Sequence, residues 1–181
     1  MTTKLKALQF PIGEFKVTDN PTETQVSEWI KDIEIFPSQL KEVIKNTSAE
    51  ALAHKYRPNG WTANQVVHHC ADSHINAFLR LKLSLTENNP TIRPYFEDRF
   101  GELIDSLDTN LTASIQIITG IHFKWSQLLK SLTVNDLQKT FFHPEHQTTF
   151  TILENIQNYS WHCKHHLQHV KNAINSNGIY N

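Results

Sequence analysis

The chain has 181 residues, 39% of them hydrophobic and 19% charged, which is the composition of an ordinary globular protein with one well-buried core. Lys and Arg number 17 and Asp and Glu 18, and because no basic block accompanies this near-zero net charge, nucleic acid and anionic membranes are poor candidates for partners. No stretch reaches the roughly 18 apolar residues of a membrane span or forms a secretion signal, and two cysteines are too few for a disulfide scaffold, so we expect one cytoplasmic domain over residues 1–181.

The first 22 residues contain Pro11, Gly13 and Pro21 and show no sustained hydrophobic period. Proline and glycine interrupt regular structure. We therefore predict an extended N-terminal arm over residues 1–22 that packs on the surface of the domain.

A first long helix is predicted from Thr22, because this residue can cap a helix and apolar residues then recur at helical spacing. Pro37 lies inside that pattern and predicts a kink or a restart near Phe36. The polar residues 46–48 should end the helix, and a short helix is expected over residues 49–54.

A second long helix is predicted from Thr62, which can act as its N-cap after a turn at residues 56–61, to about Leu85. One broad face of this helix is apolar, and a narrower polar stripe runs along its flank at positions i, i+4, i+7 and i+11. The stripe consists of His69, Ser73, Asn76 and Arg80.

The second half of the chain predicts two more long helices. A short helical piece is expected within residues 96–107, and a long helix over about 110–132. A helical turn at 133–139 and a loop or small hairpin at 141–150 then precede a capping box at 151–154, which opens the fourth long helix. We therefore predict an all-α fold, an antiparallel four-helix bundle with short extra helices and an extended N-terminal arm.

Four of the eleven histidines fall within eight residues of the fourth helix, at positions 162, 165, 166 and 169. This i, i+3, i+4, i+7 spacing puts them on one stripe. On a helical wheel, His162 and His166 border the core, whereas His165 and His169 turn away from it. Two imidazoles one turn apart can chelate one transition-metal ion, so His162 and His166 are predicted as metal ligands.

A third ligand is expected from the second helix. There His69 begins the polar stripe, whereas His74 lies at the centre of the apolar face. A metal ligand needs to be accessible to the ion and to have polar neighbours, which favours His69. The remaining histidines are interpreted as structural residues with satisfied hydrogen bonds, and both cysteines as small core residues. These are His54, His68, His74, His122, His143, His146, Cys70 and Cys163.

Several motifs resemble the DinB-like superfamily, in particular its YfiT branch of metal-dependent hydrolases, and the resemblance covers nearly the whole chain. They are Pro11-Ile12-Gly13-Glu14-Phe15, Gly60-Trp61-Thr62 with Gln65-Val66-Val67-His68-His69, Ala71-Asp72-Ser73-His74, the segment from Arg80 to Glu87, Ile92-Arg93-Pro94-Tyr95, Phe142-His143-Pro144, and Trp161-His162 with His165-His166.

The resemblance implies a four-helix bundle that holds one divalent ion, zinc as first choice and nickel as the alternative, on His69, His162 and His166. It also implies a homodimer and a small-molecule substrate. Relatives in the superfamily transfer low-molecular-weight thiols, and the YfiT branch is similar to bacillithiol transferases.

Three histidine ligands leave a coordination position open, which is typical of a catalytic metal site. We expect a metal-dependent hydrolase; a thiol S-transferase and a non-catalytic protein stabilised by metal are the alternatives. No carboxylate is identified as a general base. Asp72 can cap, pair with a cation or orient a ligand, and Arg80 can form a salt bridge or hold an anionic substrate.

Overall fold

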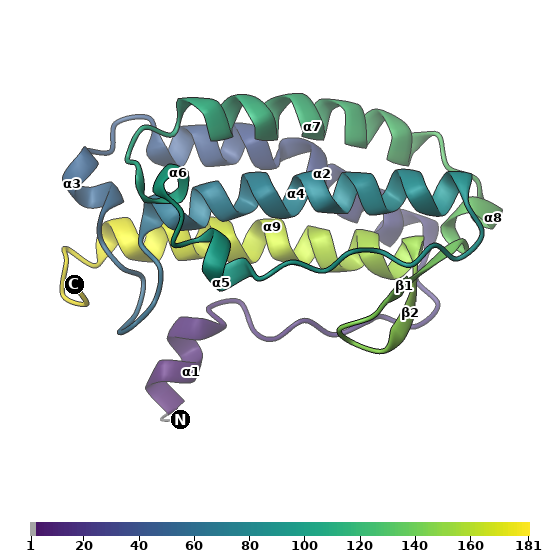
Figure 1. Ribbon diagram of the computed structural model, residues 1–181, viewed down its shortest axis with the longest axis horizontal. Coiled ribbons are helices and arrows are strands. Elements are labelled where there is room, and N and C mark those ends of the chain that lie inside the picture. Colours follow the sequence, from purple (N-terminus) through teal and green to yellow (C-terminus); the bar gives the residue numbers. More distant parts are fainter. Residues whose placement is uncertain (1–2) are drawn as a thin grey trace.

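The computed structural model describes residues 3–181, and a bundle of four long helices forms its centre. These helices are α2 (Glu23–Ile44), α4 (Ala63–Thr86), α7 (Thr112–Lys130) and α9 (Ile152–Asn175). Helices α2 and α4 each pack against both α7 and α9 (Figure 1). The predicted all-α four-helix bundle is therefore confirmed.

Three of the long helices begin where the sequence predicts, at threonine N-caps. Each threonine hydroxyl accepts a hydrogen bond from the backbone N–H three residues later, and the side chain at that position accepts one from the backbone N–H of the threonine. The pairs are Thr22 with Gln25, Thr62 with Gln65, and Thr151 with Glu154.

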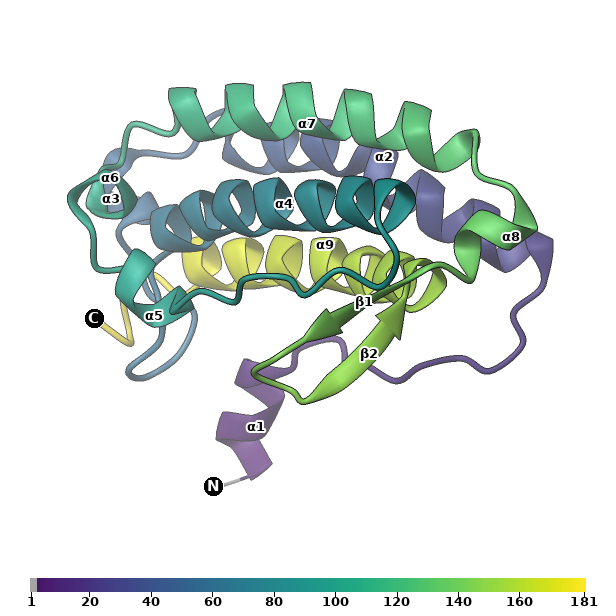
Figure 2. The same ribbon diagram turned by 45° about the vertical axis from the view of Figure 1, so that its right-hand side comes forward.

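The long connection over residues 87–111 changes the expected direction of the helices. Near its start, the backbone N–H of Ile92 donates to the carbonyl of Phe142, and near its end the carbonyl of Asp108 accepts from the side chain of Asn64, in the first turn of α4. The connection thus runs back along α4, so α4 and α7 point the same way, as do α2 and α9 (Figures 1 and 2). The prediction of a fully antiparallel bundle is wrong for these two pairs.

Short elements join the long helices. The hairpin expected near residues 141–150 consists of strands β1 (Thr140–His143) and β2 (Thr148–Thr151), which pair antiparallel with Thr140 opposite Thr151. The short helices are α3 (Ala49–Leu52), α5 (Glu97–Phe100), α6 (Ile104–Leu107) and α8 (Val134–Leu137).

The N-terminal arm is only partly extended. Within the described residues it begins with a helix, α1 (Thr3–Gln9), because this stretch precedes Pro11 and contains no proline or glycine. The rest of the arm is held against α9: the indole Nε1–H of Trp161 donates to the carbonyl of Gly13 over 3.1 Å, and the backbone N–H of Thr18 donates to Gln157 over 2.8 Å. The arm thus packs on the surface of the domain, as predicted, and it does so along α9. Residues 1 and 2 lie outside the described part.

Helix α2 continues through Pro37, so the predicted restart near Phe36 does not occur. Proline has no N–H, and the carbonyl of Ile33 therefore lacks the intrahelical partner that residue 37 would otherwise supply. Phe36 and Ile33 are fully buried, as is Trp125 of α7, so this irregular point faces the core. Among the described residues, no helix is long and apolar enough to cross a membrane.

Candidate metal centre

The three histidines predicted as ligands meet at the interface of α4 and α9. One nitrogen from each of His69, His162 and His166 lies within 4.8 Å of the other two. The Nε2 atoms of His69 and His162 are 3.3 Å apart, and the ring of His166 has its centroid 4.8 Å from that of His69 and 4.3 Å from that of His162. Helix α9 supplies two of the rings one turn apart, and its packing against α4 supplies the third.

His162 is the outermost member of a chain of three hydrogen-bonded imidazoles. Its Nδ1 lies 3.1 Å from Nε2 of His74, whose Nδ1 lies 2.7 Å from Nε2 of His122, whose Nδ1 lies 2.5 Å from the carbonyl oxygen of Ile33. A carbonyl only accepts, so each neutral ring in turn donates from Nδ1–H and accepts at Nε2. This core relay leaves a lone pair on Nε2 of His162, directed at His69.

The anchor of the core relay is the carbonyl that Pro37 leaves free in α2. A residue with an N–H at position 37 would donate to the same oxygen. The proline thereby leaves a buried carbonyl oxygen to His122 without a competing intrahelical N–H, and this acceptor sets the tautomer of His122.

His166 belongs to a second relay that ends on the N-terminal arm. Nε2 of His169 lies 3.1 Å from the carbonyl oxygen of Gln9, and its Nδ1 lies 3.4 Å from Nδ1 of His166. Because Gln9 offers only an acceptor here, His169 donates from Nε2–H and accepts at Nδ1, and His166 donates from Nδ1–H. The Nε2 lone pair of His166 takes no part in this arm relay, just as the Nε2 lone pair of His162 takes no part in the core relay.

Burial keeps these rings neutral at physiological pH. Desolvation, with a smaller contribution from the neighbouring His165, lowers the pKa of His69 to about 4. Desolvation is also the largest reason why the pKa of His162 and that of His166 lie well below the ordinary value, with other histidines adding to it. Neutral imidazole is the form that binds metal ions.

Comparison with known proteins identifies the family. The family model of the DinB superfamily matches residues 33–170, which include all four long helices in whole or in large part. The chain belongs to the DinB superfamily. This DinB-superfamily chain is 43% identical over 162 residues to a provisionally named metal-dependent hydrolase of Oceanobacillus iheyensis, covering 90% of this chain and 93% of the relative.

Two further relatives agree with that result. A provisionally named metal-dependent hydrolase of Bacillus mycoides is 42% identical over 166 residues, covering 92% of this DinB-superfamily chain and 95% of its own length. The structure of YfiT from Bacillus subtilis has a TM-score of 0.88 and 38% identity, covering 91% of this chain and 94% of YfiT. YfiT is described as having an unusual four-helix bundle topology, with a provisional assignment as a metal-dependent hydrolase.

Two other groups of possible ligands lie within the described part of this DinB-superfamily protein. One comprises His74, His122 and Cys163, and the other His165, His166 and His169. Both nitrogens of His74, His122 and His169 already take part in the relays, and burial raises the pKa of the Cys163 thiol well above its ordinary value. These groups are therefore poorer metal sites than the trio that contains His69.

The wheel misplaced two histidines of the stripe. His165 and His169 were expected to turn away from the core, but they are only 5% and 2% exposed. Trp161 stacks on His165 with ring centroids 4.1 Å apart, and Tyr56 stacks on His169 with centroids 3.9 Å apart. A wheel of one helix shows neither the loop that carries Tyr56 nor the arm that contacts His169.

The residues interpreted as structural fit that interpretation only in part. Cys70 and Cys163 are buried free thiols, and His68 is buried between the Ser114 hydroxyl and the Asp108 carbonyl. His74 and His122 also have satisfied hydrogen bonds, but they satisfy them by connecting the core to His162. The sequence contained an indication of this hydrogen-bonded connection, because both histidines lie on the apolar faces of their helices and such faces pack against each other.

A cavity of about 480 Å³ opens beside the trio. His162 forms part of its wall, together with Ser73 and Arg80 of α4 and Tyr159 of α9. Segments from the 87–111 connection and the β1–β2 hairpin close the remaining sides. The polar stripe predicted on the second helix thus leads from the trio into this cavity.

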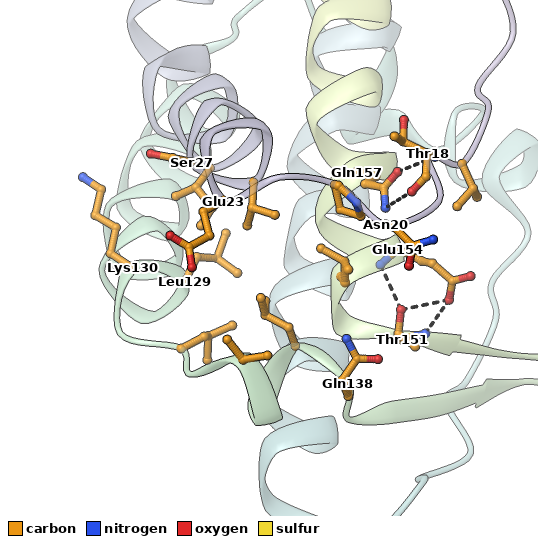
Figure 3. Close-up of a pocket in the computed structure, with 18 of the residues that line it drawn as sticks. Thr18, Asn20, Glu23, Ser27, Leu129, Lys130, Gln138, Thr151, Glu154 and Gln157 are labelled. Atoms are coloured by element: carbon orange, nitrogen blue, oxygen red, sulfur yellow. Dashed lines mark hydrogen bonds between the residues drawn. The ribbon is translucent and has the colours of Figure 1, made fainter.

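A larger cavity, of about 1080 Å³, lies away from the trio, between the arm, the first turns of α2, the end of α7 and the start of α9 (Figure 3). Its wall contains no histidine or cysteine. Figure 3 shows the Thr18–Gln157 pair and the Thr151–Glu154 capping box there, both of which are structural hydrogen bonds. The chemistry of this cavity gives no reason to place the reaction in it.

Proposed function

We propose that this chain is a divalent-metal-dependent hydrolase of a small-molecule substrate, with His69, His162 and His166 as the ligands of one ion. The observation that carries the proposal is the convergence of three neutral imidazoles, one buried and two partly buried, of which the latter two direct an Nε2 lone pair out of a hydrogen-bonded relay. The relatives named as metal-dependent hydrolases support the same reading.

The spacing of the donors fits a transition metal. Two imidazole nitrogens at about 2.0–2.1 Å from zinc, at a near-tetrahedral angle, are about 3.3 Å apart. The Nε2 atoms of His69 and His162 have this separation. An all-nitrogen donor set suits zinc and nickel better than magnesium or calcium, which prefer oxygen, so we propose zinc as the ion and nickel as the alternative.

Three protein ligands leave room for one more ligand, and a bound divalent ion would supply Lewis acidity there, which lowers the pKa of an attacking water or thiol. The protein contributes the orientation of the ligands. The core relay and the arm relay hold His162 and His166 in one tautomer and ring position. Near the site, the Ser73 hydroxyl lies 3.2 Å from the Tyr159 hydroxyl, and this pair supplies a polar wall to the cavity.

The experiment that tests the function is a reaction screen on one metal-loaded preparation. Carboxylic esters, amides and phosphoesters form one set, and electrophiles offered with bacillithiol, glutathione or cysteine form the other. Turnover of the first set that disappears on chelation supports the hydrolase. Metal-dependent conjugation without hydrolysis would support the thiol S-transferase instead of the hydrolase. Metal-dependent stabilisation without either reaction would mean that the ion has only a structural role.

Replacing His74 by phenylalanine is expected to weaken metal binding by about 10–100-fold without abolishing it. The ring remains similar in shape, but Nδ1–H of His162 loses its acceptor. A competitive titration against a chromophoric chelator measures the dissociation constant.

His68→Phe is the matched control for that variant, because His68 is also a buried histidine of α4 with two hydrogen bonds, yet it bonds Ser114 and Asp108 and takes no part in the core relay. It is expected to lower stability and leave the dissociation constant for the metal unchanged. Equal constants for the His74→Phe and wild-type proteins would contradict the role of the core relay.

A further inference from the structure

The cavity beside the trio contains an unusual share of unsatisfied hydrogen-bonding groups. In the described part of the chain, seven side-chain nitrogen or oxygen atoms are buried without a hydrogen bond of good geometry. Three of them, Nε of Arg80, the hydroxyl of Tyr95 and Nδ1 of His143, belong to residues that line this one cavity. An unpaired buried donor destabilises the fold, so three residues with such atoms around one cavity favour a polar partner that binds there.

All three groups can donate a hydrogen bond. The guanidinium of Arg80 has donors only, and Tyr95, although close to the Ser73 hydroxyl, makes no well-formed hydrogen bond. His143 is 6% exposed, and both its burial and the positive charge of Arg80 lower its pKa, so it is neutral and can donate from Nδ1. The partner that fits three donors is a group made of acceptors.

The charges near these donors restrict the kind of acceptor. No carboxylate among the described residues forms an ion pair with Arg80 within 4 Å, although Arg80 lies close enough to Glu97 to lower its pKa against a larger raising effect of burial. Three acidic residues, Glu97, Asp98 and Glu145, line the exposed rim. Such a rim repels a doubly charged phosphate more than a singly charged carboxylate.

The position of Arg80 determines how far a carboxylate bound by it would lie from the trio, where the reaction is proposed to occur. Eleven residues of α4 separate Arg80 from His69, which is about 16 Å along the helix axis. Helical side chains tilt toward the N-terminus, so the Arg80 side chain leans back toward the trio. His162 lines the same cavity, so one molecule can contact both ends.

We propose that this cavity binds the carboxylate of the substrate, with Arg80 and His143 as binding residues, and that several bonds separate this carboxylate from the group that reacts at the trio. The proposal rests on the proposed function and specifies its substrate class as small carboxylic acids. Arg80 supplies the charge and a bidentate pair of donors, and His143 and Tyr95 supply neutral donors.

Binding of two simple probes tests the proposal without any assumption about the reaction. Glutaramate carries one carboxylate at the end of a short chain, and glutaramide is its uncharged analogue. Isothermal titration of zinc-loaded and zinc-free protein is expected to show glutaramate binding in both forms and no glutaramide binding. The zinc-free protein is needed because a carboxylate that binds the ion alone would lose its affinity there.

Arg80→Gln is expected to weaken glutaramate binding by about 10–100-fold, and Arg80→Lys by less, because lysine keeps the charge but not the paired donors. Arg93→Gln is the matched control: this exposed arginine belongs to the 87–111 connection, next to the cavity-lining Pro94, but does not line the cavity itself, and its replacement should leave binding unchanged. Circular dichroism checks that each variant folds.

Equal glutaramate affinity in the Arg80→Gln and wild-type proteins would overturn the proposal, as would binding of glutaramide with similar affinity or the loss of all binding when zinc is removed. Zinc content is measured on the same samples. Failure to bind zinc would refute the proposed function alone. Glutaramate binding to the zinc-free protein would still test the role of Arg80 as a carboxylate-binding residue.

Discussion

Replacement of His166 by alanine is expected to reduce the bound metal from about one ion per chain to a small fraction of that. His166 would be a direct ligand, so its loss should exceed the roughly 10–100-fold loss of affinity seen when an outer hydrogen-bond partner of a ligand is removed. The same holds for His69 and His162, whose nitrogens share the space with that of His166. Elemental analysis after dialysis against a weak chelator measures the result.

His165→Ala is the control for this experiment. His165 is the sequence neighbour of His166 and is buried, but it stacks on Trp161 and belongs to neither relay. The variant should keep stoichiometric metal while losing some stability. Full metal content in the His166→Ala protein, or complete loss in the His165→Ala protein, would show that the ligand trio has been assigned wrongly.

The metal-free protein is expected to unfold in acid with a midpoint between about pH 5 and 6. The six histidines of the trio and the two relays have pKa values lowered chiefly by desolvation, to about 4 for His69 and His122 and to about 3 for His169. They are His69, His74, His122, His162, His166 and His169. The unfolded chain therefore takes up protons near the ordinary value of 6.5, before the folded protein can.

The direction of the pH dependence follows from this difference in pKa between the folded and the unfolded chain. The stability that depends on neutral histidines is fully present above pH 6.5 and is lost as the pH falls below that value. Each such group loses about 1.4 kcal/mol per pH unit, and six independent groups would lose roughly 8 kcal/mol over one unit, which is comparable with the 5–15 kcal/mol stability of a typical domain. Rings that share a relay titrate together, so this figure is an upper bound.

Far-UV circular dichroism as a function of pH measures the transition, and its steepness should correspond to the uptake of about four to six protons. Added zinc should shift the midpoint to lower pH, because the ion binds only the folded, deprotonated site. His54→Ala replaces a half-buried histidine outside both relays and should leave the midpoint unchanged. Retention of the helical spectrum in metal-free protein at pH 4 would refute the prediction.

The fold was largely predictable because its signals are local. Threonine caps and helical periodicity located the starts of α2, α4 and α9, and the β-prone residues that flank the loop located the hairpin. The direction of α7 was not predictable, since it depends on the path of residues 87–111, whose anchors at Ile92 and Asp108 are contacts distant in sequence.

The convergence of the three histidines was predictable where one helix determines it. The i, i+4 pair His162 and His166 needs only the geometry of α9, and His69 followed from the polar flank of α4. The relays required knowledge of three other segments: His122 on α7, Ile33 on α2 and Gln9 on the arm. For the same reason, the donors of the cavity could not be grouped before the hairpin and the connection were placed beside Arg80.

Pro37 has a consequence for anyone who wishes to engineer a sturdier version of this protein. Replacing a proline inside a helix normally improves the helix, because it restores a missing hydrogen bond. Here the restored N–H would share with His122 the carbonyl of Ile33, which anchors the core relay. The more regular α2 would then fix the tautomers of His122 and, two rings further on, of His162 less firmly, so a gain in thermal stability would come with a less well-oriented His162, one of the proposed ligands.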